Sequence, residues 1–91
     1  MKYISIRKGK VSNVYSSARE LYEDAGADKH LEMENDDFEK YQKNWRDSEL
    51  KNTDWIISVS DHSQRDAYIT YRQELRDWPS TNNFPDIIPT M

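Results

Sequence analysis

Apolar and polar residues alternate at the start of the chain. Residues 3–7 read Tyr-Ile-Ser-Ile-Arg, and a period of two is typical of a half-buried strand. Residues 8–10 suit a tight turn, and alternate positions from Val11 to Tyr15 predict a return strand. Because a lone hairpin is marginally stable in water, we expect this one to pack on another element or pair with another chain.

A short helix is predicted next. Ser17 and Glu20 have the spacing of a capping box, and Gly26 is placed to end the helix in a left-handed conformation. The apolar face of this helix would consist of Ala18, Leu21, Tyr22 and Ala25. Residues 27–35 are polar and predict a connection without regular structure.

A longer helix is expected to begin near Asn35 or Asp36, whose side chains can cap it. Three acid-before-base pairs spaced i, i+4 follow, each contributing about 0.2–0.5 kcal/mol to a helix. Its apolar positions are Phe38, Tyr41, Trp45 and Leu50. The turn-forming residues 52–54 predict its end, and residues 55–59 are then expected to form an extended connector packed on the core.

A third helix should be capped by Ser60, Asp61 or Ser63 and run to Asp77 or Trp78, because Pro79 stops it. Its apolar stripe is Ala67 or Tyr68, Tyr71, Leu75 and Trp78. Residues 80–91 contain two prolines and predict an extended tail, either packed along the helices or free.

Together these elements predict a mainly α fold with a minor β part. Its core would be two antiparallel helices, accompanied by a small N-terminal hairpin with a short helix and by an extended C-terminal tail. We expect three segments, 1–34, 35–79 and 80–91, in one compact unit. Only 35% of the 91 residues are hydrophobic, so the core depends on aromatic side chains, each able to bury roughly 150–250 Å². Binding to a partner or self-association would add stability.

The net charge and its distribution along the chain limit the classes of molecule that the chain is expected to bind. The net charge is −4 and the pI is near 5.1, which disfavours general nucleic-acid binding. Charged residues are only basic in 1–13 and almost entirely acidic in 20–39. This pattern is explained by intramolecular attraction and solvated helix faces, or by an acidic surface that attracts a basic partner. No apolar stretch reaches the ~18 residues of a membrane span, and no secretory signal is recognised. We therefore expect a soluble cytoplasmic protein with no membrane partner.

The sequence predicts no catalytic, cofactor or metal site. There is no cysteine, and His30 and His62 are isolated without a zinc-binding spacing. The acidic residues 32–37 lack the glycine and glutamate positions of a calcium loop. Two glycines cannot build a phosphate loop, and the serines near His62 lack a nucleophile-elbow pattern.

Several residues are candidates for binding a partner. Arg72 and Arg76 lie four apart beside the aromatic stripe. They either extend over the core and pair with Asp47, Asp54 or Asp61, or bind a carboxylate on a partner. The tryptophans should be mostly core, with Trp78 the most exposed. The predicted partner-binding residues are Arg72, Arg76, Trp78, Phe84, Ile87 and Ile88.

Two motifs carry a resemblance to a known family. Residues 46–55 read R-D-x-x-L-x-x-T-D-W, and residues 71–79 read Y-R-Q-x-L-R-D-x-P, followed by Phe84-Pro85 and Pro89. This combination resembles the phage tail assembly chaperone family. The matching positions are Arg46, Asp47, Leu50, Thr53, Asp54, Trp55, Asp61, Tyr71, Arg72, Gln73, Leu75, Arg76, Asp77 and Pro79.

The resemblance implies a non-enzymatic phage protein that binds a tail or tail-fibre protein during assembly in the host cytoplasm. The alternatives are a structural component of the virion tail or baseplate, and a small inhibitor of a host enzyme. The motif residues can also define the fold. Leu50, Trp55, Tyr71 and Leu75 would lock a helical hairpin, while Asp54 and Asp61 would cap it or pair with Arg72 or Arg76.

Overall fold

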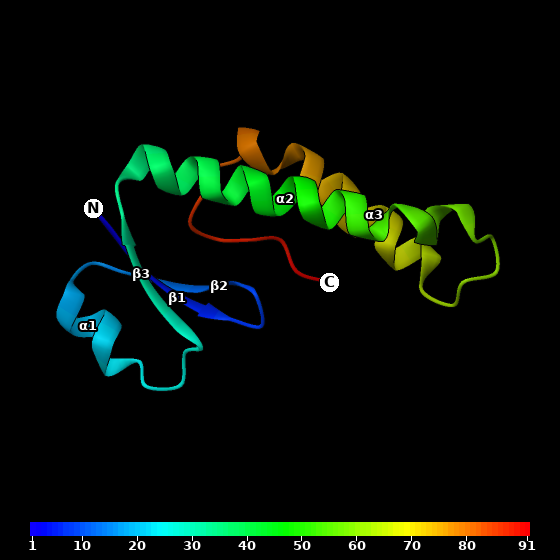
Figure 1. Cartoon of the computed structure of the whole chain (residues 1–91). Helices are drawn as coiled ribbons and strands as arrows, with labels where there is room; N and C mark the ends of the chain where they lie inside the picture. Colours follow the sequence, from blue (N-terminus) through cyan, green and yellow to red (C-terminus); the bar gives the residue numbers. More distant parts are fainter. The chain divides into compact units, whose positions relative to one another are not determined.

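The computed structural model describes all 91 residues. Its elements are β1 (Lys2–Arg7), β2 (Lys10–Tyr15), α1 (Ala18–Glu23), β3 (Lys29–Met33), α2 (Asn35–Ser58), α3 (Arg65–Asp77) and the 3-10 turn η1 (Trp78–Ser80) (Figure 1). Helices hold 51% of the residues and strands 19%, which confirms a mainly α fold with a minor sheet. The chain packs as two compact units, Met1–Tyr41 and Gln42–Met91, here called the sheet unit and the helical unit.

The predicted N-terminal hairpin is present. β1 and β2 pair antiparallel from Tyr3 opposite Tyr15 to Arg7 opposite Lys10. The turn places Lys8 at φ 55° and Gly9 at φ 77°, the positive angles that tight hairpin turns require and that glycine adopts without strain. The backbone N–H of Lys8 donates to the Asp28 carboxylate at 2.9 Å, which holds this turn against the following loop.

A third strand stabilises the hairpin, and the predicted polar connection over residues 27–35 is therefore wrong. β3 pairs antiparallel with β1, from Lys2 opposite Met33 to Ile6 opposite Lys29, so the sheet order is β2-β1-β3. Leu31 and Met33 pack against the core. The two apolar residues are separated by Glu32, and an alternation this short among charged residues becomes a strand because β1 offers it a pairing edge.

The two faces of the sheet have different coverings. Ile4, Ile6 and Val11 are buried together with Phe38 from the beginning of α2. Ser5 points to the opposite face and is fully buried, on the side where α1 contacts all three strands. The sheet unit therefore has an apolar core on one face and a polar, helix-covered layer on the other.

α1 begins as predicted and ends early. The Ser17 hydroxyl accepts a hydrogen bond from the Glu20 backbone N–H, which confirms the predicted N-cap. The helix ends at Glu23, and the C-cap residue is Asp24 at φ −80°. The predicted left-handed end at Gly26 is wrong. Gly26 instead lies close to Arg7, whose guanidinium would be 3.2 Å from an added Cβ.

α2 continues to Ser58, so both the predicted end at residues 52–54 and the extended connector over 55–59 are wrong. The Thr53 hydroxyl donates to the Glu49 carbonyl one turn earlier, at 2.7 Å. This back-bonding lets a turn-forming residue remain helical. The helix end is held by Arg65, whose Nε donates to the Ile57 carbonyl at 3.0 Å, because terminal carbonyls attract cations.

α3 runs antiparallel to α2 and lies beside it (Figure 1). The predicted caps Ser60, Asp61 and Ser63 are wrong, because the N-cap residue is Gln64 and its side chain makes no capping bond. The helix ends at Asp77, as predicted. Residues 81–91, here called the tail segment, form turns up to residue 87 and no regular structure thereafter.

Candidate functional site

A buried arginine ties α3 to α2. Arg72 is 5% exposed, and its guanidinium donates to the Leu50 carbonyl, to the Thr53 hydroxyl at 2.6 Å and to the Asp54 carboxylate at 3.1 Å. We call these four residues the Arg72 clasp. The fork of N–H groups on a guanidinium can serve three acceptors at once, which an ammonium group cannot do in the same geometry.

The clasp explains why the two sequence motifs occur together. Leu50, Thr53 and Asp54 belong to the first motif, and Arg72 belongs to the second. The predicted pairing of Arg72 with Asp54 is confirmed. Since the guanidinium is buried in these internal contacts, Arg72 acts as a structural residue and offers no free cation to a partner.

Tyr71, next to the clasp, makes a second link between the helices. Its side chain is buried, and its hydroxyl donates to the Glu49 carboxylate at 3.2 Å. Burial, assisted by the nearby negative charge of Glu49, raises the pKa of the Tyr71 phenol above its ordinary range. The phenol therefore stays protonated and continues to donate across the hairpin.

Trp78 lies in the core, so the prediction that it is the most exposed tryptophan is wrong. It is 2% exposed. Its ring makes edge contacts with Trp45 on α2, at a centroid distance of 6.0 Å, and with Phe84 in the tail segment, at 5.0 Å. Leu75 is also fully buried. Pro79 turns the chain into η1 directly after this cluster, which brings the tail segment back onto the helices.

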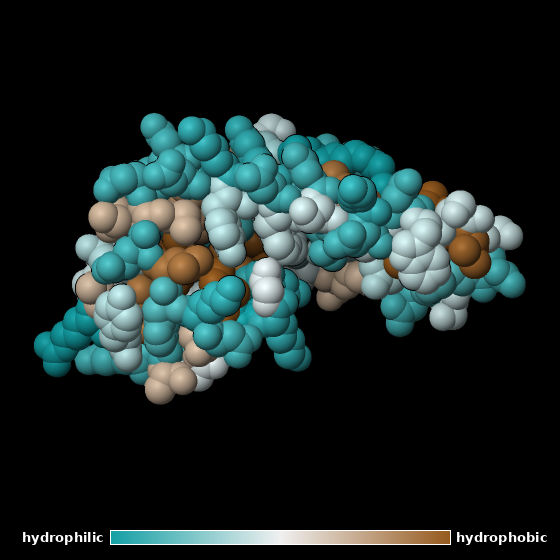
Figure 2. Space-filling view, viewed as in Figure 1, coloured by the Kyte–Doolittle hydropathy of each residue, from teal (hydrophilic) through white to brown (hydrophobic).

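Trp55 is on the surface, so its predicted role in locking the hairpin is also wrong. It is 58% exposed and makes edge contact with His62 at 5.7 Å, while His62 contacts Tyr68 at 6.2 Å. Figure 2 shows pale and brown atoms gathered at the end where α2 turns into α3. The extension of α2 past residue 54 causes this placement, because it carries Trp55 around the helix and away from α3.

The tail segment lies against both helices and borders a groove. The Gln42 side-chain N–H donates to the Pro85 carbonyl at 2.9 Å, and the Lys43 ammonium lies 5.8 Å from the Phe84 ring centroid. The groove has a volume of about 440 Å³. Its lining includes Glu74, Asp77, Trp78, Ile87, Ile88 and Pro89. Ile87 is 61% exposed, whereas Phe84 and Ile88 are half-buried.

The other motif residues lie outside the clasp. Arg46 pairs with its neighbour Asp47 at 3.0 Å. Asp61 and Arg76 are exposed, and the predicted alternatives in which they pair across the hairpin are not seen. Of the predicted partner-binding residues, Arg76, Ile87 and Ile88 thus have surface accessible to another molecule, together with the outer part of Phe84.

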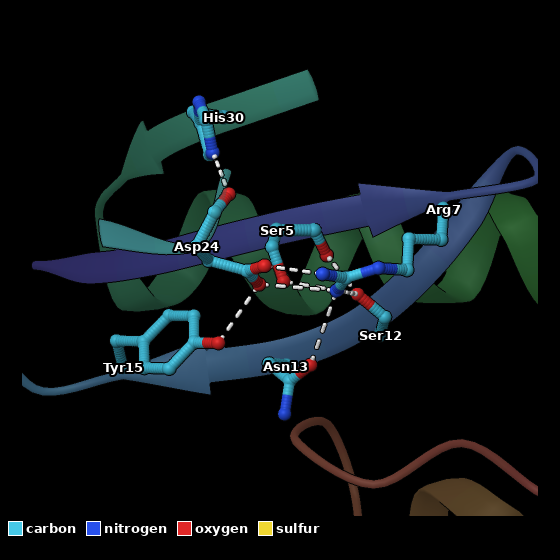
Figure 3. Close-up of polar contacts among 7 residues, drawn as sticks. All are labelled: Ser5, Arg7, Ser12, Asn13, Tyr15, Asp24 and His30. Atoms are coloured by element: carbon cyan, nitrogen blue, oxygen red, sulfur yellow. Dashed lines mark hydrogen bonds and ion pairs between the residues drawn. The ribbon is translucent and has the colours of Figure 1, made fainter. Parts of the chain in front are cut away.

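A separate polar network lies in the sheet unit, where Asp24 at the C-terminal end of α1 faces the hairpin (Figure 3). The Arg7 guanidinium binds both oxygens of the Asp24 carboxylate, and the Tyr15 hydroxyl donates to the same carboxylate at 2.8 Å. Arg7 also donates to the Ser12 hydroxyl at 2.8 Å. The hydrogen bond from Arg7, followed by that from Tyr15, lowers the pKa of Asp24 from 3.8 to about 2. This network joins α1 to both strands of the hairpin.

In both the Arg72 clasp and the Arg7 network, the arginine binds acceptors within the chain and holds neighbouring elements in position. No group of three or more histidine, cysteine or acidic side chains is placed to hold a metal ion. None of the helices has the length and apolar character needed to cross a membrane.

Comparison of the sequence with known protein families identifies the family of this chain. The model of the phage tail assembly chaperone protein family matches residues 28–90, a span that includes the clasp, the buried tryptophan cluster and the tail segment. The chain belongs to the phage tail assembly chaperone family. The family name suggests a chaperone role in phage tail assembly, and such a role suggests a non-enzymatic protein. Among curated proteins and solved structures, no match to the chain was found.

Two features of this family member were missed by sequence reasoning. Gln42 is fully buried and binds the tail segment. The sequence pattern that could have revealed it is its position four residues after Phe38, on the apolar side of the helix. Asp24 had no signal of its own, because its partners Arg7 and Tyr15 come from two strands whose pairing brings them together.

Proposed function

We propose that this chain is a non-enzymatic assembly chaperone that binds a phage tail or tail-fibre protein in the infected cell through the surface at which its tail segment meets α2 and α3. The observation that carries the proposal is the exposure of aliphatic side chains within the family-matched region. Ile87 is 61% exposed at the rim of the groove. An apolar side chain in this position gains free energy when a partner covers it.

The chemistry of the groove supports binding as the activity. Its apolar side chains provide contact area, and Glu74 and Asp77 provide negative charge at the rim. Apolar contact area surrounded by polar groups is the usual composition of a protein interface. Holding an exposed apolar segment of a tail protein would keep that segment from aggregating before it is assembled.

The test is co-expression of this chain with the tail and tail-fibre proteins encoded by the same phage. We expect one of them to become more soluble and to co-purify with the chain. Absence of both effects for every tail protein would contradict the proposal. Mass spectrometry of purified particles separates a chaperone, which leaves, from a structural component, which remains.

The proposed surface has a matched control on the same unit. Ile87→Ser removes the exposed aliphatic group at the groove, and Ile69→Ser removes an equally large exposed group on α3, where Ile69 is 40% exposed. We expect Ile87→Ser to change co-purification about fivefold or more, weakening it if the client covers Ile87 and strengthening it if the client displaces the tail segment, and Ile69→Ser to leave it unchanged. Equal effects of the two variants would place the binding surface elsewhere.

A further inference from the structure

The contact between the tail segment and the helices leaves a buried polar atom without a hydrogen bond. Gln42 donates from its side-chain nitrogen to the Pro85 carbonyl, but the Gln42 side-chain oxygen is buried without a partner. A glutamine amide can bond both the N–H and the C=O of one residue. Proline has no N–H, so Pro85 satisfies only half of this amide. Buried polar atoms without partners are unfavourable.

A second buried atom in the same cluster has no partner either. The indole N–H of Trp78 donates to nothing, although the Trp78 ring is packed between Trp45 and Phe84. Most buried polar groups in native structures are hydrogen-bonded. The tail segment thus leaves two buried hydrogen-bonding groups beside it unsatisfied.

The groove beside the tail segment is also acidic. Glu74 and Asp77 line it beside Ile87, and residues 80–91 contain no lysine or arginine. The tail segment therefore brings no basic side chain to these carboxylates. An occupant with a cation at the position of Ile87 would be electrostatically favoured.

We propose that the helix surface under residues 84–89 binds an extended segment of the client tail protein, and that the chain's own tail segment covers this surface until the client displaces it. The client segment carries an aromatic side chain that packs on Trp78, then a non-proline residue that bonds Gln42 through its N–H and C=O, then a lysine or arginine facing Glu74 and Asp77. This inference rests on the proposed function and specifies its partner.

Tethering explains why this helix surface is covered in the isolated chain. A segment attached by a few residues has an effective concentration in the millimolar range. Even a weakly matched tail segment then keeps the surface covered. A client displaces it only when its own contacts are better, so loosening the tail segment should uncover the surface.

The first experiment loosens the tail segment in the full-length chain. Phe84→Ala removes its main contact with Trp78, and Asn82→Ala, an exposed residue, is the matched control. The probe is a fluorescent peptide of residues 82–91. We expect Phe84→Ala to bind the peptide at least tenfold more tightly than the unmodified chain or Asn82→Ala. If Phe84→Ala loses its helical circular dichroism, Phe84→Leu replaces it.

The second experiment tests the role of Gln42 with a double-mutant cycle. The peptide and its Pro85→Ala version are each measured against Phe84→Ala chains with and without Gln42→Met. Gln42→Met should weaken the Pro85→Ala peptide about threefold to tenfold more than the original peptide, because only the former has both bonds to lose. Differences in peptide backbone preference cancel in the cycle. Equal weakening would overturn the role assigned to Gln42.

The third experiment tests charge and the client itself. An Ile87→Lys peptide should bind about twofold to fivefold more tightly at low salt, and Glu74→Gln with Asp77→Asn should remove the gain. A client that co-purifies with the chain should be released by excess peptide from the Phe84→Ala chain. If the client stays bound, the helix surface under residues 84–89 is not its site, although the proposed function stands. Dimers that exchange tail segments would instead make a second copy the occupant and overturn the inference.

Discussion

In each unit of the molecule an arginine joins neighbouring elements, but one of these arginines is partly exposed and the other is buried. In the sheet unit, Arg7 is partly exposed and binds the Asp24 carboxylate, with serine and asparagine side chains around it. In the helical unit, Arg72 is buried and binds a main-chain carbonyl and a hydroxyl as well as the exposed carboxylate of Asp54. Water can replace part of the Arg7 contacts and the contact of Arg72 with Asp54, but it has little access to the contacts of Arg72 with the Leu50 carbonyl and the Thr53 hydroxyl.

The same contrast applies to the aromatic residues of the helical unit. Trp78 is enclosed, whereas Trp55, on the neighbouring helix, is 58% exposed. Residue type alone therefore does not predict how much a side chain stabilises the fold. The predictions below test whether the burial of a side chain, rather than its residue type, determines how much it stabilises the fold. They begin with the largest expected effect.

Trp78→Ala should lower the free energy of unfolding by about 3–5 kcal/mol, because it leaves a cavity between Trp45 and Phe84. Urea denaturation monitored by circular dichroism measures this loss. Trp78→Phe fills part of the space and should recover at least half of it. A loss below about 1 kcal/mol for Trp78→Ala would show that the cluster does not support the helical unit.

Arg72→Met should cost about 1.5–3 kcal/mol, because it removes charge-assisted hydrogen bonds from a buried position while keeping the apolar stem. Arg7→Met is the matched variant in the sheet unit and should cost less, since its guanidinium is partly exposed. Arg72→Lys should not restore stability, because a lysine cannot reproduce the fork. If urea melts show a larger loss of unfolding free energy for Arg7→Met than for Arg72→Met, the partly exposed arginine is the more important one for stability and the prediction is wrong.

Acid should weaken the sheet unit through Asp24. The pKa of Asp24 is lowered from 3.8 to about 2 in the folded protein, so its contribution is complete above pH 3.8 and is lost as the pH falls towards 2. Urea melts across this window should show a decrease in stability that Asp24→Asn reduces. Glu32→Gln, a change at an exposed carboxylate on β3, is the control. An unchanged pH dependence in Asp24→Asn would assign the acid effect to other groups.

Trp55→Ala should have the smallest effect on stability, below about 1 kcal/mol, because its ring is mostly in solvent. Thermal and urea denaturation should both show this. Trp45→Ala is the comparison on the same helix, where the ring contacts Trp78. A loss of about 3 kcal/mol or more for Trp55→Ala would mean that the ring is covered in solution.

Much of the local structure was predictable from the sequence. The alternation in residues 3–7 and 11–15, the capping serine at 17 and the stop at Pro79 all appear in the structure. These features depend on residues close in sequence, so local backbone preferences are enough to predict them. Of the residues predicted to bind a partner, Arg72 and Trp78 are internal whereas Ile87 is exposed, and their role in binding stays a prediction.

The sequence by itself determined a mainly α chain with an N-terminal hairpin, and its two motifs identified the family. Only the tertiary structure decided that residues 29–33 pair with β1, that α2 continues to Ser58, and that Trp78 rather than Trp55 is enclosed. Each of these outcomes depends on a contact across many residues, such as that of Arg72 with Leu50 and Thr53. Local preferences of about 1 kcal/mol per residue are overridden when such contacts compete with them.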